Sequence, residues 1–272
     1  MSMVASRSKR LSSDTRPLAR LYARHESAVL KILGIASAIG VWQLAVAIGL
    51  VSPMVVSSPS RILVAGASYL ASQQFVIDAR TSGLEFVGGF GLAVIIGVAL
   101  GFATGWLRRV EHFLDPLINF LYAAPRVALA PLLIIWFGIG IESKVAFIFL
   151  MSVFPIIINT AMGVHSVDGD LLDLARSLNA STWQLMRTIV FPSAVPFIVT
   201  GIRIGLGVGL IGVVVGEFVA STSGIGFTIS QAASSYDVDL VFVGIIIIGT
   251  AGAMLTEALR RLERRMAKWK LH

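Results

Sequence analysis

The sequence predicts an all-α membrane protein, a polytopic bundle of about six transmembrane helices. Composition is the first reason: of 272 residues, 56% are hydrophobic and only 14% are charged, whereas a soluble domain carries about 25% charged residues. The second reason is the length of the apolar runs, since six stretches reach or approach the roughly 20 residues that a spanning helix needs. A soluble protein with an unusually apolar core fits this composition poorly.

The six expected spans contain almost no charge. They are residues 32–51, 86–107, 117–141, 145–164, 193–216 and 240–256. The first run is too long for the apolar region of a signal peptide and lacks a clear small-residue cleavage site after it, so we expect a retained span. Only Arg126 and Arg203 interrupt the runs. A charge at mid-bilayer costs about 2.5–3.5 kcal/mol on insertion scales, so both should face the bundle interior.

The distribution of Lys and Arg predicts the orientation. With the N-terminus inside, the cytoplasmic segments hold sixteen of these residues and the external loops hold three, Arg61, Arg80 and Lys144. Because cytoplasmic loops carry the excess of positive charge, both termini should be cytoplasmic, which requires an even number of spans. We therefore expect a basic N-terminal tail (1–28), a transmembrane domain (29–259) and a basic C-terminal tail (260–272).

Two expected spans carry glycines four residues apart, which places them on one helix face. Such faces allow helices to pack closely in lipid, so we expect internal packing, with the lining of a pathway as the alternative. The two ladders are Gly97, Gly101 and Gly105, and Gly201, Gly205 and Gly209.

Prolines within or near the spans predict kinks or interruptions, because proline cannot donate the helix hydrogen bond. They are Pro125, Pro131, Pro155 and Pro196. Asn159 in the fourth run is expected to form a hydrogen bond between helices. Between the first two spans, residues 62–79 are expected to form an amphipathic helix on the external membrane face.

The loop between the fourth and fifth spans (165–192) is predicted to form two helices. Asp168 or Asp170 can cap the first helix, and leucines then recur at helical spacing up to Leu178. Asn179 follows, and Asn tolerates the left-handed conformation that ends helices.

Ser181 and Gln184 form a capping-box pattern that predicts a second helix, and Pro192 is expected to end it. The pair of helices presents apolar residues on the cytoplasmic side. An apolar helical face in water needs a cover. Either the loop folds back on its own bundle, or a partner covers it.

This loop resembles the signature loop of permease subunits of ATP-binding-cassette importers. That signature reads Glu-Ala-Ala, three residues, Gly, nine residues, Ile, any residue, Leu-Pro; the spacing here matches, with departures at Asp173, Leu174, Asn179 and Phe191. In the family, the first loop helix is a coupling helix that sits in a groove of the ATPase subunit. The resemblance implies an ATPase-coupling role for Asp173, Leu174, Ala175, Arg176, Leu178, Asn179, Ala180, Ile189 and Pro192.

The resemblance covers about residues 40–270 and is closest to the sulfonate, taurine and nitrate branch. It rests on Pro125, Ala128–Leu132, Trp136–Gly140, Phe154-Pro155, Asn159-Thr160, Gly201–Arg203, Glu217 and Gly224–Gly226. It implies the type I importer permease fold and an inner-membrane permease that forms the pathway for a small solute, in particular an anion such as a sulfonate, taurine, nitrate or bicarbonate. The implied partners are a second permease copy, two ATPase subunits that bind the ATP, and an extracytoplasmic binding protein; no cofactor is implied.

Three residues are candidates for the substrate pathway or a gate. Arg126 follows Pro125, and both substrate contact and snorkelling to the interface are open for it. Arg203 forms a structural ion pair or carbonyl clamp, or lines the pathway. Glu217 is an exposed loop acid, an external gate, or a contact for the protein that delivers the substrate.

Other functions find little support. There is no cysteine and no Gly-Lys dipeptide, so thiol chemistry and a phosphate-binding P-loop are excluded. The His-Glu-x-x-His and Gly-x-Ser-x-Gly motifs are missing, and all four histidines lie outside the spans. We expect no catalytic and no metal-binding residue. The remaining alternative is a self-contained secondary transporter or channel, which would need ion-coupling carboxylates inside the spans.

Overall fold

The computed structural model describes residues 17–52 and 55–267, and every regular element in these ranges is helical. The chain divides into two compact units at residue 61. The first contains α1 (Pro17–Ala47) and the start of α2 (Pro59–Leu70). The second continues with α3 (Gln73–Trp106), α4 (Arg108–Ala123), the 3-10 turn η1 (Arg126–Leu129), α5 (Ala130–Phe137), α6 (Ile141–His165), α7 (Gly169–Ser177), α8 (Thr182–Leu185), the π-helical turn η2 (Met186–Val190), α9 (Phe191–Val219), α10 (Ile225–Ser234) and α11 (Val238–Ala267).

Within the described residues, four helices are long and apolar enough to cross a membrane. They are α3, α6, the continuous helix Thr182–Val219 and α11. A fifth crossing is possible if α4 and the following segment Arg126–Phe137 act together, and α1 contains a shorter apolar stretch, Ile32–Ala47. This inventory is compatible with the predicted all-α bundle of about six transmembrane helices.

The third expected span is not one straight helix. Residues 117–141 were expected to cross as one run, but the chain bends by 90° between α4 and Arg126–Phe137. Ala124 is extended, with φ −63° and ψ 146°, because the ring of a following proline disfavours the helical conformation. The interruption expected at Pro125 is therefore confirmed. Pro155 and Pro196, by contrast, lie inside continuous helices.

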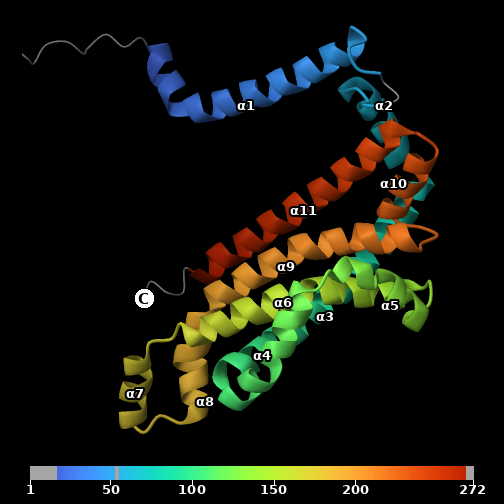
Figure 1. Cartoon of the computed structure of the whole chain (residues 1–272). Helices are drawn as coiled ribbons and strands as arrows, with labels where there is room; N and C mark the ends of the chain where they lie inside the picture. Colours follow the sequence, from blue (N-terminus) through green and yellow to red (C-terminus); the bar gives the residue numbers. More distant parts are fainter. Residues whose placement is uncertain (1–16, 53–54, 268–272) are drawn as a thin grey trace, which may run out of the picture. The chain divides into compact units, whose positions relative to one another are not determined.

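The centre of the second unit is α6, which packs against both α3 and α9 (Figure 1). The predicted glycine ladder of α3 makes the first contact. A Cβ atom on Gly101 would lie 2.5 Å from Thr160 Cβ and 2.7 Å from the Ile157 carbonyl oxygen. Gly89 extends the ladder, and the fully buried Ala93 lies between the glycines. The two backbones thus approach more closely than side chains would allow.

The second ladder, on α9, contacts a different face of α6. Gly201 lies against Asn159 and the Pro155 carbonyl, and Gly205 lies against the Ser152 carbonyl. The close approach lets Ser152 Oγ donate to the Gly205 carbonyl at 3.0 Å. Both ladders therefore serve internal packing, as predicted. The Asn159 amide, however, donates to the Pro155 carbonyl of its own helix at 2.8 Å, so the hydrogen bond expected between helices is wrong.

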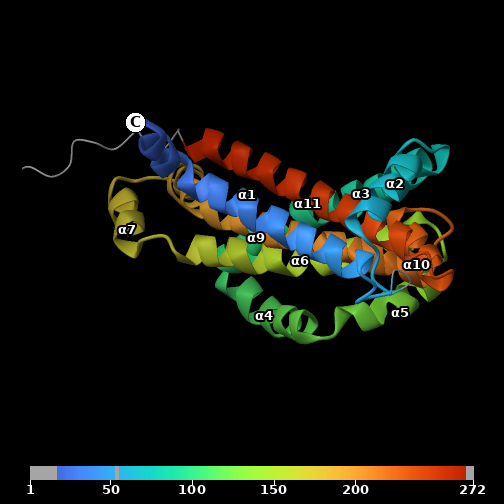
Figure 2. The same ribbon diagram turned by 90° about the horizontal axis from the view of Figure 1, so that it is seen from above.

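The two ends of the second unit differ. Figure 2 shows α7 beyond one end of α6, and α10, α5 and α2 gathered at the opposite end. We call these the α7 end and the α10 end. The amphipathic helix expected over residues 62–79 is in fact two helices, because α2 ends at Leu70 and Ser72 caps α3 by accepting from Phe75 N at 3.2 Å.

The helices extend into both expected tails. α1 begins at Pro17, inside the segment 1–28, and α11 continues to Ala267, past the expected boundary at residue 260. Residues 1–16 and 268–272 of those tails lie outside the described residues.

A Gly101→Ala substitution should destabilise the protein by about 1–3 kcal/mol, because its methyl group collides with α6. Gly91 on the same helix provides the matched control, since a Cβ there meets nothing within 4 Å. Gly91→Ala should leave stability unchanged or raise it by about 0.5–1 kcal/mol through helix propensity. Thermal unfolding in detergent measures both, and equal melting of the two variants would contradict the packing described here.

Candidate functional site

The loop at the α7 end begins with a capped helix. Asp168 is the N-cap of α7, and its carboxylate accepts from Asp170 N at 2.9 Å. Of the two predicted caps, Asp168 is therefore the one used. Asp170 lies in the first turn, where the helix dipole favours a negative charge. Arg176 in the last turn forms an exposed ion pair with Asp173 at 3.0 Å.

Asn179 ends α7 in the predicted left-handed conformation, with φ 59°. Its N–H donates to the Arg176 carbonyl at 2.9 Å, and the Ala180 N–H donates to the Ala175 carbonyl at 3.0 Å. These two bonds make a Schellman motif, in which the residue after the C-cap must adopt positive φ. The family signature has glycine here, and asparagine satisfies the same backbone requirement.

The predicted capping box starts the second helix of the loop. Ser181 Oγ accepts from Gln184 N at 3.3 Å, and Gln184 Oε1 accepts from Ser181 N at 2.7 Å. The expectation that Pro192 ends this helix is wrong, because α8, η2 and α9 run on to Val219. The π-helical turn is the physical reason. The Phe191 N–H donates to Met186 rather than to Arg187. Single π-helical turns of this kind occur inside α-helices, so Pro192 follows the turn without ending the helix.

One side of the loop packs on the bundle. Leu172 and Met186 contact a cluster that includes Val164, Val190 and Ala194. Other apolar side chains of the loop are exposed. Leu174 is 59% exposed, Leu178 is 75% exposed and Trp183 is 73% exposed. The loop therefore folds back on one side and leaves an uncovered apolar surface on the other, which we call the loop surface (Leu171, Leu174, Leu178 and Trp183).

Arg126 lies at the break between α4 and α5 and points toward α6. Its Nη1 donates to the Met151 carbonyl at 3.0 Å. Its guanidinium carbon also lies 5.1 Å from the centroid of the Tyr122 ring and 5.8 Å from that of Phe154. A cation between two aromatic faces is stabilised by their quadrupoles. Arg126 is half-buried, so its position is fixed while part of the guanidinium stays accessible.

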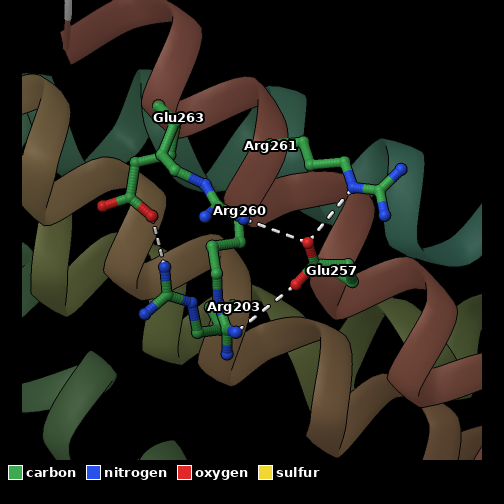
Figure 3. Close-up of polar contacts among 6 residues, drawn as sticks. Arg203, Glu257, Arg260, Arg261 and Glu263 are labelled. Carbon is green, nitrogen blue, oxygen red and sulfur yellow. Dashed lines mark hydrogen bonds and ion pairs between the residues drawn. The ribbon is translucent and has the colours of Figure 1, made fainter. Parts of the chain in front are cut away.

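Arg203 forms a structural ion pair, which is one of the alternatives predicted for it. Figure 3 shows its guanidinium reaching from α9 to Glu263 on α11. On α11, Glu257 contacts Arg260 at 3.3 Å, Arg261 at 3.1 Å and Arg264 at 3.0 Å. Arg203 thus connects α9 to the basic end of α11.

Glu217 is buried at the α10 end, with 1% exposure, and is no exposed loop acid. One carboxylate oxygen accepts from Ser82 Oγ at 2.6 Å. The other accepts from the backbone N–H groups of Gly226 at 2.6 Å and Phe227 at 3.1 Å. Glu217 therefore fixes the start of α10. Gly224 lies against its carboxylate with φ 123°, a conformation that suits glycine.

Asp78 makes a second set of contacts to the same segment. Its carboxylate accepts from Thr228 Oγ1 at 2.8 Å and from Gly224 N at 2.9 Å. It also accepts from Tyr69 Oη at 2.7 Å. Burial, together with this bond, raises the pKa of Tyr69, so the phenol stays a donor. We call Asp78, Ser82 and Glu217, with residues 224–228, the outer polar cluster, after the outward orientation that the charge pattern predicts for this end.

The sequence reasoning missed three buried ionisable residues. Asp78 fell in the helix expected on the external face (62–79), and Glu85 lay just before the second span, which was expected to begin at residue 86. In the structure α3 begins at Gln73 and both residues are buried. Lys144, expected in an external loop, is buried in the first turn of α6 and donates to the carbonyls of Ile139 and Gly140. A helical reading of residues 73–85, which puts Asp78, Ser82 and Glu85 on one face, could have found the first two.

Comparison with known proteins decides the family. Residues 93–268 match the model of the family described as binding-protein-dependent transport system inner membrane component. The chain belongs to this family. It is a permease, the membrane-spanning transport subunit of an ATP-binding-cassette importer, in agreement with the resemblance found in the loop and spans.

Named relatives cover most of the permease. It is 35% identical to a putative aliphatic sulfonates transport permease protein of Bacillus subtilis over 85% of this chain and 84% of that one. It is 34% identical to the taurine transport system permease protein of Escherichia coli over 88% and 89%. It is 35% identical to the riboflavin transport system permease protein of Chloroflexus aurantiacus over 78% and 80%.

A solved structure supports the fold alone. A chain of the MetNI methionine ABC transporter, solved in inward-facing conformations, has a TM-score of 0.52 and 16% identity, over 67% of this chain and 94% of that chain. The predicted importer permease fold is thereby confirmed.

A Glu217→Ala substitution should lower the stability of the permease by about 1–3 kcal/mol, because it leaves the buried donors of the outer polar cluster unpaired. Thermal unfolding in detergent measures the loss. The exposed Asp115 on α4 supplies the control, and Asp115→Ala should melt like the wild type. If Glu217→Ala melts with that control, the carboxylate does not hold the start of α10.

Proposed function

We propose that this permease forms the pathway for a small organic or inorganic anion and is driven by a separate ATPase through the loop surface. The observation that carries the proposal is the exposed apolar loop surface. It lies on a loop whose helices and turn are fixed by capping hydrogen bonds. A leucine that is 75% exposed on a capped helix has no role in the stability of the chain itself, and suits a groove on another protein.

The coupling residues fall into two groups in this proposal. Asp168, Asn179 and the capping box hold the shape of α7 and its turn, while Leu174 and Leu178 supply the contact. The signature position occupied by Leu174 is alanine in the family, so the groove on the cognate ATPase should be wide enough for a larger side chain. ATP binding and hydrolysis take place on that partner.

Movement of the loop can reach the membrane through two helices. α7 follows directly after α6, and the second helix of the loop is continuous with α9 through the π-helical turn. A rigid helix transmits a displacement at its end along its length. We therefore place the coupling step at α7 and its effect on the packing of α6 and α9.

Orientation and assembly follow the charge pattern and the family. The excess of Lys and Arg places the α7 end and both termini in the cytoplasm, and the α10 end faces outward to a substrate-binding protein. Two copies of the permease enclose one pathway.

The alternative of a self-contained secondary transporter is not supported by the buried carboxylates of the outer polar cluster, because Asp78 and Glu217 accept hydrogen bonds from the protein itself.

Arg126 supports an anionic substrate. Its guanidinium is held by one carbonyl and two aromatic rings at an interrupted span and retains accessible donors. The relatives named for sulfonates and taurine agree with this chemistry, although the relative named for riboflavin has similar identity. Arg203 and Glu217 take their ion-pair and hydrogen-bond partners within the permease, and in this proposal they position helices along the pathway.

A Leu174→Glu substitution should weaken assembly with the ATPase subunit at least about tenfold, because it places a charge in an apolar groove. Co-purification from membranes and substrate uptake in proteoliposomes measure the loss. Leu174→Met is the matched control, since it keeps an apolar side chain of similar size. Unchanged co-purification and uptake with Leu174→Glu would rule out coupling through the loop surface.

The cognate binding protein, purified with the ligand that it retains, should contain a sulfonate or another small anion. Native mass spectrometry identifies that ligand. Uptake by the reconstituted complex should then fall at least about tenfold in Arg126→Gln, and Arg126→Lys should recover part of it. A retained ligand without an anionic group, with uptake that does not depend on Arg126, would contradict the anion proposal.

A further inference from the structure

Tyr236 connects α10 to α11 and has two unusual properties. It is 85% exposed, more than any other large apolar or aromatic side chain whose exposure the structure describes. It also has φ 58°, and Asn179 is the only other residue there, apart from glycines, with positive φ. Residues with a Cβ atom rarely adopt this backbone conformation, because the Cβ atom comes too close to the following carbonyl oxygen.

The backbone around Tyr236 requires this conformation. The Tyr236 N–H donates to the Ala233 carbonyl at 3.2 Å, and the Asp237 N–H donates to the Ala232 carbonyl at 2.8 Å. This is the same Schellman motif that ends α7 at Asn179. Glycine is the usual residue at this position and asparagine is the next, so tyrosine is the costly choice at the second of two equivalent turns.

The Tyr236 side chain makes no contact within the described residues that would offset the strain of this conformation. The Tyr236 hydroxyl forms no hydrogen bond to any described residue, and its ring is almost fully in the open. Strained backbone positions persist where the surrounding structure imposes them, and they cluster at functional sites.

The turn holds the backbone of Tyr236 between two anchored helices. Asp237 accepts from Leu240 N at 3.1 Å and so starts α11. On the other side, α10 is anchored to the outer polar cluster by the hydrogen bond from Thr228 to Asp78. Its residues Ile229 and Ala232 are buried. A ring on such a base loses little conformational entropy when a partner covers it.

The surroundings of the ring suit a protein surface better than lipid chains. Gln231, Ser234, Ser235 and Asp237 are all exposed. They carry one amide, two hydroxyls and one carboxylate and are close to Tyr236 along the chain; we call them its polar rim. Tyrosine is enriched among the residues that dominate protein–protein binding energy, and these sit inside a rim of weaker contacts.

We propose that the turn Gln231–Asp237, with Tyr236 at its centre, is a docking contact for the extracytoplasmic binding protein. The family of this permease depends on such a protein. The inference rests on the proposed function for the orientation that turns the α10 end outward. The tyrosine ring inserts into the binding protein, and the polar rim pairs with hydrogen-bonding groups around it.

The test uses the complex of permease and ATPase subunits in phosphatidylcholine nanodiscs, with the purified binding protein of the same system. Its concentration for half-maximal stimulation of ATP hydrolysis is measured. In Tyr236→Asn this concentration should rise at least about tenfold, while hydrolysis without binding protein stays unchanged. The same variant should melt about 2–4 °C higher, because asparagine relieves the strained turn. Tyr236→Phe keeps the ring and should bind within about threefold of the wild type.

The outcomes separate the inference from the proposed function. A higher melting temperature in Tyr236→Asn with an unchanged half-stimulating concentration would overturn the docking role and leave the importer intact. A lower melting temperature in nanodiscs but not in detergent would instead identify Tyr236 as a lipid anchor, which also overturns it. A wild-type complex that does not respond to the binding protein would overturn the proposed function, and the docking contact with it.

Discussion

The close approach of α6 to α3 and α9 is the constraint on which the second unit depends. In lipid, apolar side chains gain little from leaving their surroundings for one another, so helices associate through packing and hydrogen bonds. Glycines on α3 and α9 let both backbones reach the α6 surface, where a methyl group on Gly101 would overlap Thr160. The bond from Ser152 to the Gly205 carbonyl forms only at this separation.

The same three helices determine what happens at both ends of the permease. At the α10 end, α3 and α9 together present Asp78, Ser82 and Glu217 to the backbone of one short segment. Buried carboxylates require such partners, because an unpaired charge away from water is costly. At the α7 end, α6 and α9 lead into the two helices of the loop, so the proposed ATPase contact joins the centre of the bundle directly. The π-helical turn before Pro192 keeps that connection helical.

The chain uses one backbone motif at both ends with different residues. Asn179 and Tyr236 occupy equivalent positions in two Schellman turns. The first turn is built with a residue that accepts positive φ easily and leaves the contact with a partner to the leucines beside it. The second puts an aromatic residue with positive φ at a position where its side chain is 85% exposed. The proposed partners differ accordingly: an apolar groove on the ATPase, and a polar protein surface with an aromatic pocket.

The sequence by itself determined the all-α class, the glycine faces, the caps of the coupling loop and the family, because periodicity, capping chemistry and signature spacing are local properties. It could not determine that the chain bends by 90° at the interruption near Pro125, that a π-helical turn carries the helix past Pro192, or that α3 begins at Gln73 with three buried polar residues in its first turns. Those features depend on the packing contacts and hydrogen-bond partners that other helices provide. The Glu217 carboxylate illustrates this: its position at the end of an apolar run left an exposed acid, a gate and a contact for the delivering protein open. Only the fold brings Ser82 and the amides of Gly226 and Phe227 within hydrogen-bonding distance of the buried carboxylate.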